Sequence, residues 1–239
     1  MTYQPGLFNG KRALVAGGTQ GIGAVIANHL AALGAQVTAL GRSGGDGTLD
    51  AAVELRQADI GSGAGLDTAL ADIERLDIVF NCAGILQRGA EHDIEVFEKV
   101  LAVNLTGTMR VCGATRERLK ASKGCIVNTA SMLSFFGGGL VPAYAASKGG
   151  VAQLTKSLAI AYAADGIRVN AVAPGWIATP MTQALQDDPG RAGPILARTP
   201  IGRWGTPDDV ARAAVFLCTP AASFMTGVIL PVDGGYMVS

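Results

Sequence analysis

Short apolar segments rich in Val, Ile and Ala alternate with longer helical patterns along the chain, and this alternation constrains the fold more than any other feature. The expected strands cover residues 12–17, 35–40, 53–59, 77–84, 124–131, 167–175 and 228–235. They lack apolar–polar alternation, which is typical of strands buried on both faces of a parallel sheet. Because strand–helix–strand units close with right-handed crossovers, the sequence predicts an α/β fold with a doubly wound, seven-stranded, mostly parallel sheet and helices on both faces.

Helical patterns cover residues 23–33, 94–120, 143–164 and 207–218. Residues 41–52 are too few and too rich in glycine for a full helix. No linker or shift in composition divides the 239 residues, so we expect a single domain over residues 1–239. Residues 177–205 contain four prolines and follow the sixth expected strand, at the sheet edge where open α/β folds bind ligands. We interpret this segment as a substrate lid.

The composition excludes several classes of protein. The 19 Lys and Arg residues balance the 19 Asp and Glu residues without a basic stripe, so no nucleic-acid partner is expected. No segment has the length of about 18 uncharged apolar residues that a membrane helix needs, and the amino-terminus does not resemble a signal peptide. The four cysteines form no CxxC pair, which favours reduced thiols in a cytoplasmic protein. His29 and His92 are interpreted as structural, and no metal site is expected.

A glycine-rich turn, "AGGTQGIG" (residues 16–23), lies between the first expected strand and the first expected helix. Its glycines allow the backbone to approach a pyrophosphate, which the free N–H groups at the start of the helix then bind. The chain has no GxxxxGK motif, so a P-loop is excluded. The residues of the turn that we expect to bind a dinucleotide are Gly17, Thr19, Gln20, Gly21, Ile22 and Gly23.

The second expected strand ends in "LGRS" (residues 40–43). Sites that prefer NAD place an acid at this strand end for the ribose 2′-hydroxyl, but here the position is Gly41. Arg42 and Ser43 follow, and a guanidinium with a hydroxyl suits a 2′-phosphate. This favours NADP(H), with NAD(H) possible. The alternative is that Arg42 only stacks on the adenine.

A tyrosine and a lysine are spaced as one turn of a helix would place them. Tyr144 and Lys148 are four residues apart and therefore share a helix face. A nearby ammonium favours the phenolate, so the pair could act as a general acid and base. Such a pair alone is more often a solvated surface pair. Its context indicates otherwise, because Ser131 ends the preceding expected strand at the same edge of the sheet.

Taken together, the motifs resemble the short-chain dehydrogenase/reductase family over essentially the whole chain. They are "GGTQGIG", "NCAG" (81–84), "VNLTG" (103–107), the Ser131–Tyr144–Lys148 spacing, "NAVAPGWIATP" (170–180) and "PVDGG" (231–235). The resemblance implies a Rossmann-type fold, a homotetramer or homodimer, and a catalytic tetrad of Asn104, Ser131, Tyr144 and Lys148. Tyr144 would exchange a proton with the substrate oxygen, which Ser131 would hold. Lys148 would lower the tyrosine pKa and bond the nicotinamide ribose.

The resemblance also implies a role for Asn104 and further cofactor contacts. Asn104 would help to hold a water that links Lys148 to solvent, and it would also stabilise a kink in its helix. Asp59 and Ile60 would border the adenine, Asn81, Ala83 and Gly84 the adenosine ribose, and Pro174, Gly175, Ile177 and Thr179 the nicotinamide carboxamide and pyrophosphate. Two positions depart from the family pattern: Ala16 stands where Thr is frequent, and Cys82 where a second Asn is usual.

The substrate is less constrained. "ASMLSFFGGGLVPAYAASK" and "RTPIGRWGTPDDV" resemble the ketodeoxygluconate and gluconate 5-dehydrogenase branch, which implies a secondary alcohol or ketone of a sugar acid, a polyol or a similar small hydroxy compound. Arg88, Arg191 and Arg198 are candidates for binding a carboxylate, although each could equally be a surface residue. Alternatives are a 3-oxoacyl-thioester (acyl-carrier-protein) reductase and a non-catalytic nucleotide-sensing protein. The Tyr144–Lys148 pair disfavours the sensing protein.

Overall fold

A seven-stranded parallel sheet forms the centre of the described chain, with the order β3-β2-β1-β4-β5-β6-β7. The computed structural model describes residues 2–61 and 63–239. The strands are β1 (Arg12–Ala16), β2 (Gln36–Gly41), β3 (Glu54–Gln57), β4 (Ile78–Asn81), β5 (Cys125–Thr129), β6 (Arg168–Pro174) and β7 (Ile229–Val232). This confirms the predicted doubly wound α/β fold.

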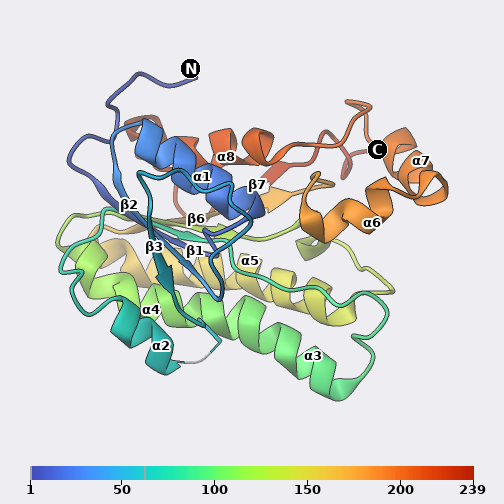
Figure 1. The fold of residues 1–239 in the computed structure, drawn as a ribbon, viewed down its shortest axis with the longest axis horizontal. Coiled ribbons are helices and arrows are strands. Elements are labelled where there is room, and N and C mark those ends of the chain that lie inside the picture. Colours follow the sequence, from blue (N-terminus) through green and yellow to red (C-terminus); the bar gives the residue numbers. More distant parts are fainter. Residues whose placement is uncertain (1, 62) are drawn as a thin grey trace.

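Helices cover both faces of the sheet (Figure 1). The described helices are α1 (Gly21–Ala32), α2 (Gly63–Ala69), α3 (Ile94–Leu101), α4 (Gly107–Lys120), α5 (Pro142–Tyr162), α6 (Gln183–Gln186), α7 (Pro189–Ala197) and α8 (Pro207–Phe216). One core cluster packs α1 and α8 against one face of the strands, and a second packs α4 and α5 against the other. The central strands are buried on both sides, which explains why they lack apolar–polar alternation.

The helix predicted over residues 94–120 is divided in the structure. Helices α3 and α4 are separated by a π-helical segment, Ala102–Thr106. The backbone hydrogen-bond pattern therefore changes between the two helices. Helices α2, α6 and α7 were not predicted from the sequence. Helix α7 begins at Pro189 and contains Pro194, and this proline content obscured the short helix.

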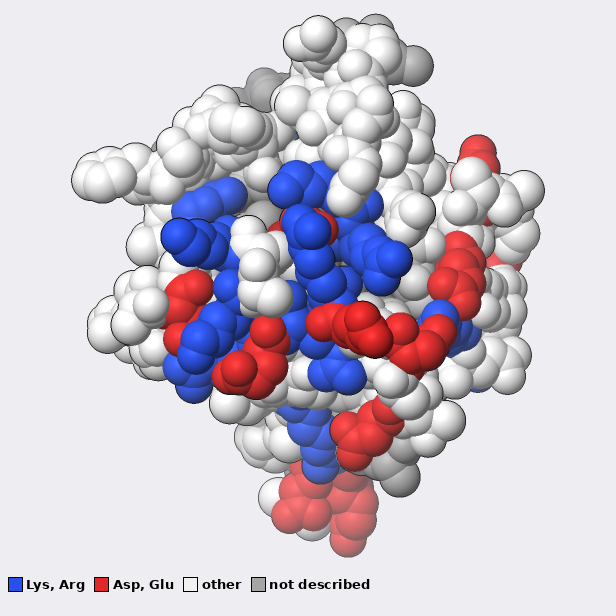
Figure 2. Space-filling model, turned by 90° about the vertical axis from the view of Figure 1, so that its left-hand side faces the viewer, with Lys and Arg blue, Asp and Glu red and all other residues white. Residues whose placement is uncertain are grey.

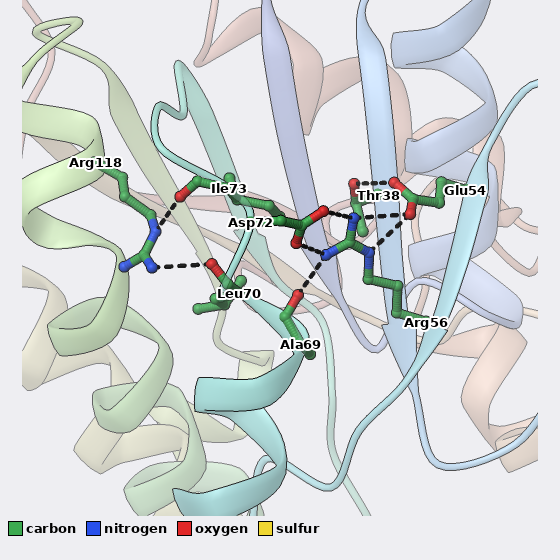
Figure 3. A network of polar contacts seen from close by, with 8 residues as sticks. All are labelled: Thr38, Glu54, Arg56, Ala69, Leu70, Asp72, Ile73 and Arg118. Atoms are coloured by element: carbon green, nitrogen blue, oxygen red, sulfur yellow. Dashed lines mark hydrogen bonds and ion pairs between the residues drawn. The ribbon is translucent and has the colours of Figure 1, made fainter.

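Side chains tie the outer strand of the sheet to the neighbouring helices (Figure 3). Arg56 of β3 donates to Glu54, to the carbonyl of Ala69 and to Asp72. Thr38 of β2 donates to Glu54 at 3.1 Å, so the contacts cross from one strand to the next. The edge strand β3 has only four residues and is mostly exposed, and these contacts fix it between β2 and α2.

Positive and negative side chains are mixed on the side of the molecule opposite the α6–α7 segment. Figure 2 shows Lys and Arg gathered in the middle of this face with Asp and Glu beside them. Ion pairs of the chain include Lys11–Asp77 at 3.0 Å and Lys120–Asp165 at 3.2 Å.

Within the described residues, no helix is long and apolar enough to cross a membrane.

Candidate active site

The turn between β1 and α1 approaches the end of β4 so closely that one position requires glycine. Gly17 has a φ of +77°, and a Cβ added there would lie 2.3 Å from the backbone nitrogen of Ala83. The loop therefore packs directly on the "NCAG" segment, and two motifs far apart in the sequence form one wall of the site.

The start of α1 presents free backbone N–H groups to this site. Its N-cap residue, Gln20, makes no side-chain capping bond, and its first turn contains no acid. Asp46, in the loop after β2, has a pKa held below its usual range by a hydrogen bond from Thr48, with a contribution from the backbone of Gly21. This helix end therefore favours negative charge, as a pyrophosphate-binding helix does. The residues present fit a dinucleotide cofactor.

A cavity of about 510 Å³ runs along the carboxyl ends of the central strands. The predicted residues that line it are Gly17, Thr19, Gln20, Gly21, Ile22, Gly23, Arg42, Ser43, Asp59, Ile60, Ala83, Gly84, Ser131, Tyr144, Lys148, Pro174, Gly175, Ile177 and Thr179. Its volume lies in the range of small-molecule and cofactor sites, about 300–1,000 Å³. The structure thus brings together residues from several separate stretches of the chain, whereas Asn81 and Asn104 are not among the lining residues.

The end of β2 cannot carry the acid that NAD-preferring sites use. A Cβ at Gly41 would lie 2.4 Å from Thr19 Oγ1, so this position has no room for a side chain. Arg42 and Ser43 follow it, are exposed, and line the cavity. The local geometry therefore leaves a guanidinium and a hydroxyl, and no carboxylate from position 41, at this end of the site.

Asn81 is predicted to flank the adenosine ribose, and its side chain does not line the cavity. Its side chain is buried at 3% exposure, and its Nδ2 donates to Asn128 Oδ1 at 2.9 Å and to Cys112 Sγ at 3.3 Å. Asn128 in turn donates to Thr155 of α5 at 2.9 Å. Asn81 therefore joins β4 to β5 and α4 beneath the site, because its side chain points to the interior and not into the cavity.

Ser131, Tyr144 and Lys148 meet where β5 ends and α5 begins. Ser131 caps a short 3₁₀ turn by accepting from the backbone N–H of Leu133, and Ser134 of that turn donates to the carbonyl of Lys148 at 2.7 Å. Lys148 is buried, and its Nζ donates to the carbonyl of Thr129 at 2.6 Å and lies 5.6 Å from the centre of the Tyr144 ring. Short contacts between the strand end and the helix thus fix all three residues.

Burial shifts the pKa values of both the tyrosine and the lysine. Burial raises the pKa of Tyr144 to about 12, while a hydrogen bond with Ser131 lowers it and the charge of Glu91 raises it further. Burial lowers the pKa of Lys148 to about 8, against a smaller opposing effect of Cys82. The sequence analysis expected Lys148 to lower the tyrosine pKa. In the structure burial dominates, because both groups are removed from water together.

Asn104 lies in the π-helical segment and binds the segment after β4, which lines the site. Its side chain accepts from the backbone N–H of Ile85 at 2.8 Å and donates to the carbonyl of Ile85 at 2.9 Å and to Ser147 Oγ at 3.0 Å. Its amide therefore joins the segment after β4 to α5. A Cβ at Gly84 would lie 3.5 Å from Asn104 Oδ1 and 3.7 Å from Lys148 Nζ, so Gly84 lies next to both side chains.

The three candidate arginines occupy different environments. Arg88 is half-buried and lines the cavity, and burial, followed by the nearby charge of Arg191, lowers its pKa. Arg191 is exposed on α7. Arg198 stacks 4.4 Å over the Tyr236 ring and 5.7 Å over the Phe136 ring, and it does not line the cavity. Arg88 alone among them therefore faces the site directly.

Several residues of the site had no sequence signal. Trp176, Met132, Leu133 and Met181 add apolar surface to the cavity. The Nε1 of Trp176 is buried and has no hydrogen-bond partner among the described residues. Glu91 is fully buried beside Tyr144. An isolated acid in a loop carries no pattern that would distinguish it from a solvated one. In the described part of the chain, no group of three His, Cys, Asp or Glu side chains could hold a metal ion.

Known proteins match the chain over almost its full length. The family described as Enoyl-(Acyl carrier protein) reductase matches residues 16–237. A 2-dehydro-3-deoxy-D-gluconate 5-dehydrogenase of Pseudoalteromonas atlantica is 42% identical over 96% of this chain and 97% of its own. A cis-4-hydroxycyclohexanecarboxylate dehydrogenase of Sinomonas cyclohexanicum is also 42% identical, over 96% of this chain and 97% of its own.

A solved structure agrees with these relatives. A crystal structure from Agrobacterium tumefaciens, provisionally described as a 2-deoxy-D-gluconate 3-dehydrogenase with bound NADP, superimposes with a TM-score of 0.90 at 41% identity and covers 99% of this chain and 100% of its own. Sequence identity, fold and the arrangement of the cavity lead to the same family. The chain belongs to the short-chain dehydrogenase/reductase family of NAD(P)-dependent oxidoreductases.

Proposed function

We propose that this protein interconverts a secondary alcohol and a ketone of a small hydroxy acid, with NADP(H) as the cofactor and Tyr144 as the acid and base. The observation that carries the proposal is the convergence of Ser131, Tyr144 and Lys148 on one cavity with the start of α1. The chemistry that NADP(H) supplies when bound is the transfer of a hydride to or from the substrate carbon. The loop from Gly17 to Gly23 and the start of α1 would hold its pyrophosphate.

The residues of the chain divide the remaining work. Ser131 donates a hydrogen bond that orients the substrate oxygen, and Tyr144 exchanges a proton with that oxygen. With a pKa raised to about 12, the Tyr144 hydroxyl is protonated at neutral pH and is ready to act as an acid in ketone reduction. Alcohol oxidation requires the phenolate, so its rate should rise with pH. Lys148, when protonated, stabilises that phenolate.

The cofactor preference follows from the end of β2. Gly41 leaves no room for an acid, and Arg42 with Ser43 suits a 2′-phosphate. The Agrobacterium structure, which has bound NADP, supports the same preference.

The carboxylate of the substrate would bind Arg88. Arg88 lines the cavity, and the nearby charge of Arg191 adds to the positive potential at this side. The two relatives are named for substrates that carry a carboxylate and a secondary alcohol, which supports a hydroxy acid here. A sugar acid of the ketodeoxygluconate or gluconate type is our first choice. The apolar surface from Met132, Leu133, Trp176 and Met181 instead favours the second candidate, a 3-oxoacyl thioester.

Replacing Tyr144 tests the proposal most directly. We expect Tyr144→Phe to bind cofactor normally and to lose activity by about 10²–10⁴, because the acid and base is removed. The parent enzyme should be assayed with sugar acids, polyols and β-keto thioesters, each with NADPH or NADP and with NADH or NAD. Arg88→Gln should raise the KM for a sugar acid and leave the KM for a polyol unchanged. Activity of Tyr144→Phe equal to that of the parent would refute the assignment.

The organisation of the chain is part of the proposal. We infer a single domain over residues 1–239, with a lid at about residues 177–205. Ala178 donates to the carbonyl of Gly205 at 2.8 Å, which joins the two ends of this segment. Only its first part, through Thr182, lines the cavity. The four cysteines are free in the structure, in keeping with the cytoplasmic location that we infer.

A further inference from the structure

Glu91 is a fully buried carboxylate to which the proposed chemistry assigns no role. It lies in the segment between β4 and α3, and its side chain is 0% exposed. Its Oε1 accepts from the backbone N–H of Gln87 at 2.8 Å, and its Oε2 accepts from the backbone N–H of Tyr144 at 2.8 Å. A buried carboxylate is costly unless its oxygens are bonded, so this position is built to hold one.

The bond to Tyr144 caps the helix that carries the acid–base pair. Helix α5 begins at Pro142, and its N-cap residue, Val141, makes no side-chain capping bond. The N–H of Tyr144 is one of the amide groups in the first turn that no carbonyl of the helix can accept. Glu91 accepts it from a distant segment and places a negative charge at the positive end of the helix dipole.

The same segment forms the substrate side of the cavity. Arg88, three residues before Glu91, lines the cavity. The segment is also held at Gly89, whose N–H donates to the carbonyl of Leu140 at 2.8 Å, and at Ile85, which Asn104 binds. Glu91 therefore joins the wall that carries Arg88 to the helix turn that carries Tyr144.

The charges around this contact come from several elements. Arg88, which lines the cavity, is close enough to Glu91 and to Arg191 for both charges to act on its pKa. Lys148 Nζ, one turn further along α5, lies 5.6 Å from the centre of the Tyr144 ring. His92, the neighbour of Glu91 in the chain, has its Nε2 3.0 Å from the carbonyl of Gly139. Cys82 lies beside Lys148. The negative charge that acts on Tyr144 comes from Glu91, which raises the pKa of the phenol.

We propose that Glu91 is a positioning residue: it fixes the first turn of α5 against the segment that carries Arg88, and it sets the electrostatic environment of the Tyr144 hydroxyl. The inference rests on the proposed role of Tyr144 as acid and base. Glu91 would act in two ways, through its negative charge and through the length of its side chain. Each of these can be removed by a separate substitution.

Two substitutions separate the contributions. Glu91→Gln keeps the size and removes the charge, so the rise of the oxidation rate with pH should move to lower pH. Glu91→Asp keeps the charge and shortens the side chain, so kcat should fall by about tenfold because Tyr144 is displaced, while the pH dependence stays that of the parent. Glu98→Gln, an exposed glutamate on α3, is the matched control and should change neither.

A second measurement does not depend on activity. The titration of Tyr144 can be followed by NMR with isotope-labelled tyrosine, using Tyr144→Phe to assign its signal. In Glu91→Gln this titration should move to lower pH as the rate profile does. If Tyr144 is not the catalytic group, the titration would still shift although the rate profile would not, which distinguishes failure of the proposed function from failure of this inference.

The outcomes that overturn the inference are equally distinct. A folded Glu91→Gln variant with the titration of the parent would refute the electrostatic role, as would an equal shift in Glu98→Gln. If Glu91→Gln does not fold, as judged by circular dichroism, Glu91→Asp remains decisive. Parental kcat in that variant would refute the positioning role, and a lowered kcat with an unchanged pH profile would support it.

Discussion

Burial governs the behaviour of the two central ionisable side chains, Tyr144 and Lys148. Each is shifted toward its neutral form, Tyr144 upward to about 12 and Lys148 downward to about 8. The two side chains therefore change their charge in different pH ranges. The tyrosine retains its proton over the neutral range, whereas the lysine is close to half-charged in the mildly alkaline range. Within this pair, only Lys148 is close to the balance between its charge states at mildly alkaline pH.

We expect Lys148 to make the stability of the protein depend on pH. Its folded pKa of about 8 lies below the ordinary 10.5, so between these values the unfolded chain binds a proton that the folded chain does not. The contribution of Lys148 to the free energy of unfolding should therefore rise with pH across that window. Lys148→Met should lack this rise.

The measurement is denaturant unfolding of the parent and Lys148→Met at about pH 7.5 and about pH 10, which bracket most of the window. The difference between the two proteins should grow in favour of the parent at the higher pH. Lys156→Met, at an exposed position of α5, controls for loss of a lysine. A difference that is constant with pH would contradict the prediction.

Arg42 should discriminate between the two cofactors. Because its guanidinium is placed for a 2′-phosphate, Arg42→Ala should weaken NADPH binding by about tenfold to a hundredfold and NADH binding much less. Fluorescence titration of both cofactors measures this directly. Equal losses for NADPH and NADH would mean that Arg42 only stacks on the adenine.

At the scale of elements, the edge strand β3 depends on side-chain contacts more than the central strands do. It has four mostly exposed residues, and Arg56 joins it to Ala69 at the end of α2 and to Asp72 in the turn that follows (Figure 3). Ala58, Asp59 and Ile60 follow this strand directly and line the cavity. The contacts of Arg56 thus lie outside the site and yet support its adenine end.

We expect Arg56→Gln to loosen this edge without unfolding the protein. Amide hydrogen exchange should become faster over β3 and Ala58, because the strand loses its anchors to α2. The cofactor should bind about twofold to fivefold more weakly, since exposed ion pairs contribute little individually. Lys99→Gln, on α3, is the control. Parental exchange rates over β3 would show that strand pairing with β2 alone fixes this edge.

At the scale of the whole molecule, the outer faces of α4 and α5 keep large apolar side chains in contact with solvent. Ile160 of α5 is 81% exposed and Met109 of α4 is 42% exposed. Surface apolar residues are common singly, but these two lie on neighbouring helices that cover the same face of the sheet (Figure 1). This placement suits the homotetramer or homodimer that the family resemblance implies.

We therefore expect light scattering to give a mass that is a multiple of the 24.3 kDa of one chain. Ile160→Asp should shift the protein toward the monomer, because a charge would be buried in the interface. Ala32→Asp, at an exposed position of α1 on the opposite face of the sheet, is the matched control. A parent protein that is monomeric at micromolar concentration would contradict the expectation.

Local patterns in the sequence were enough to predict the sheet, the phosphate-binding turn and the sheet edge at which Ser131, Tyr144 and Lys148 meet. Strand burial, glycine spacing and helix periodicity are patterns among residues that are close in the sequence. They can therefore be recognised before the tertiary structure is known. The bounds of the strands shifted by a few residues, and the short helices α2, α6 and α7 had no clear periodicity.

Tertiary structure alone decided the features that depend on distant contacts. It turned Asn81 into the interior, placed Arg198 over two aromatic rings and brought Glu91 to the first turn of α5. It also buried Tyr144, which raises the pKa of its phenol to about 12. The physical reason is that burial and charge proximity are properties of residues far apart in the chain. The sequence determined that Ser131, Tyr144 and Lys148 would meet at one edge of the sheet, and the fold determined the water and charge that surround them.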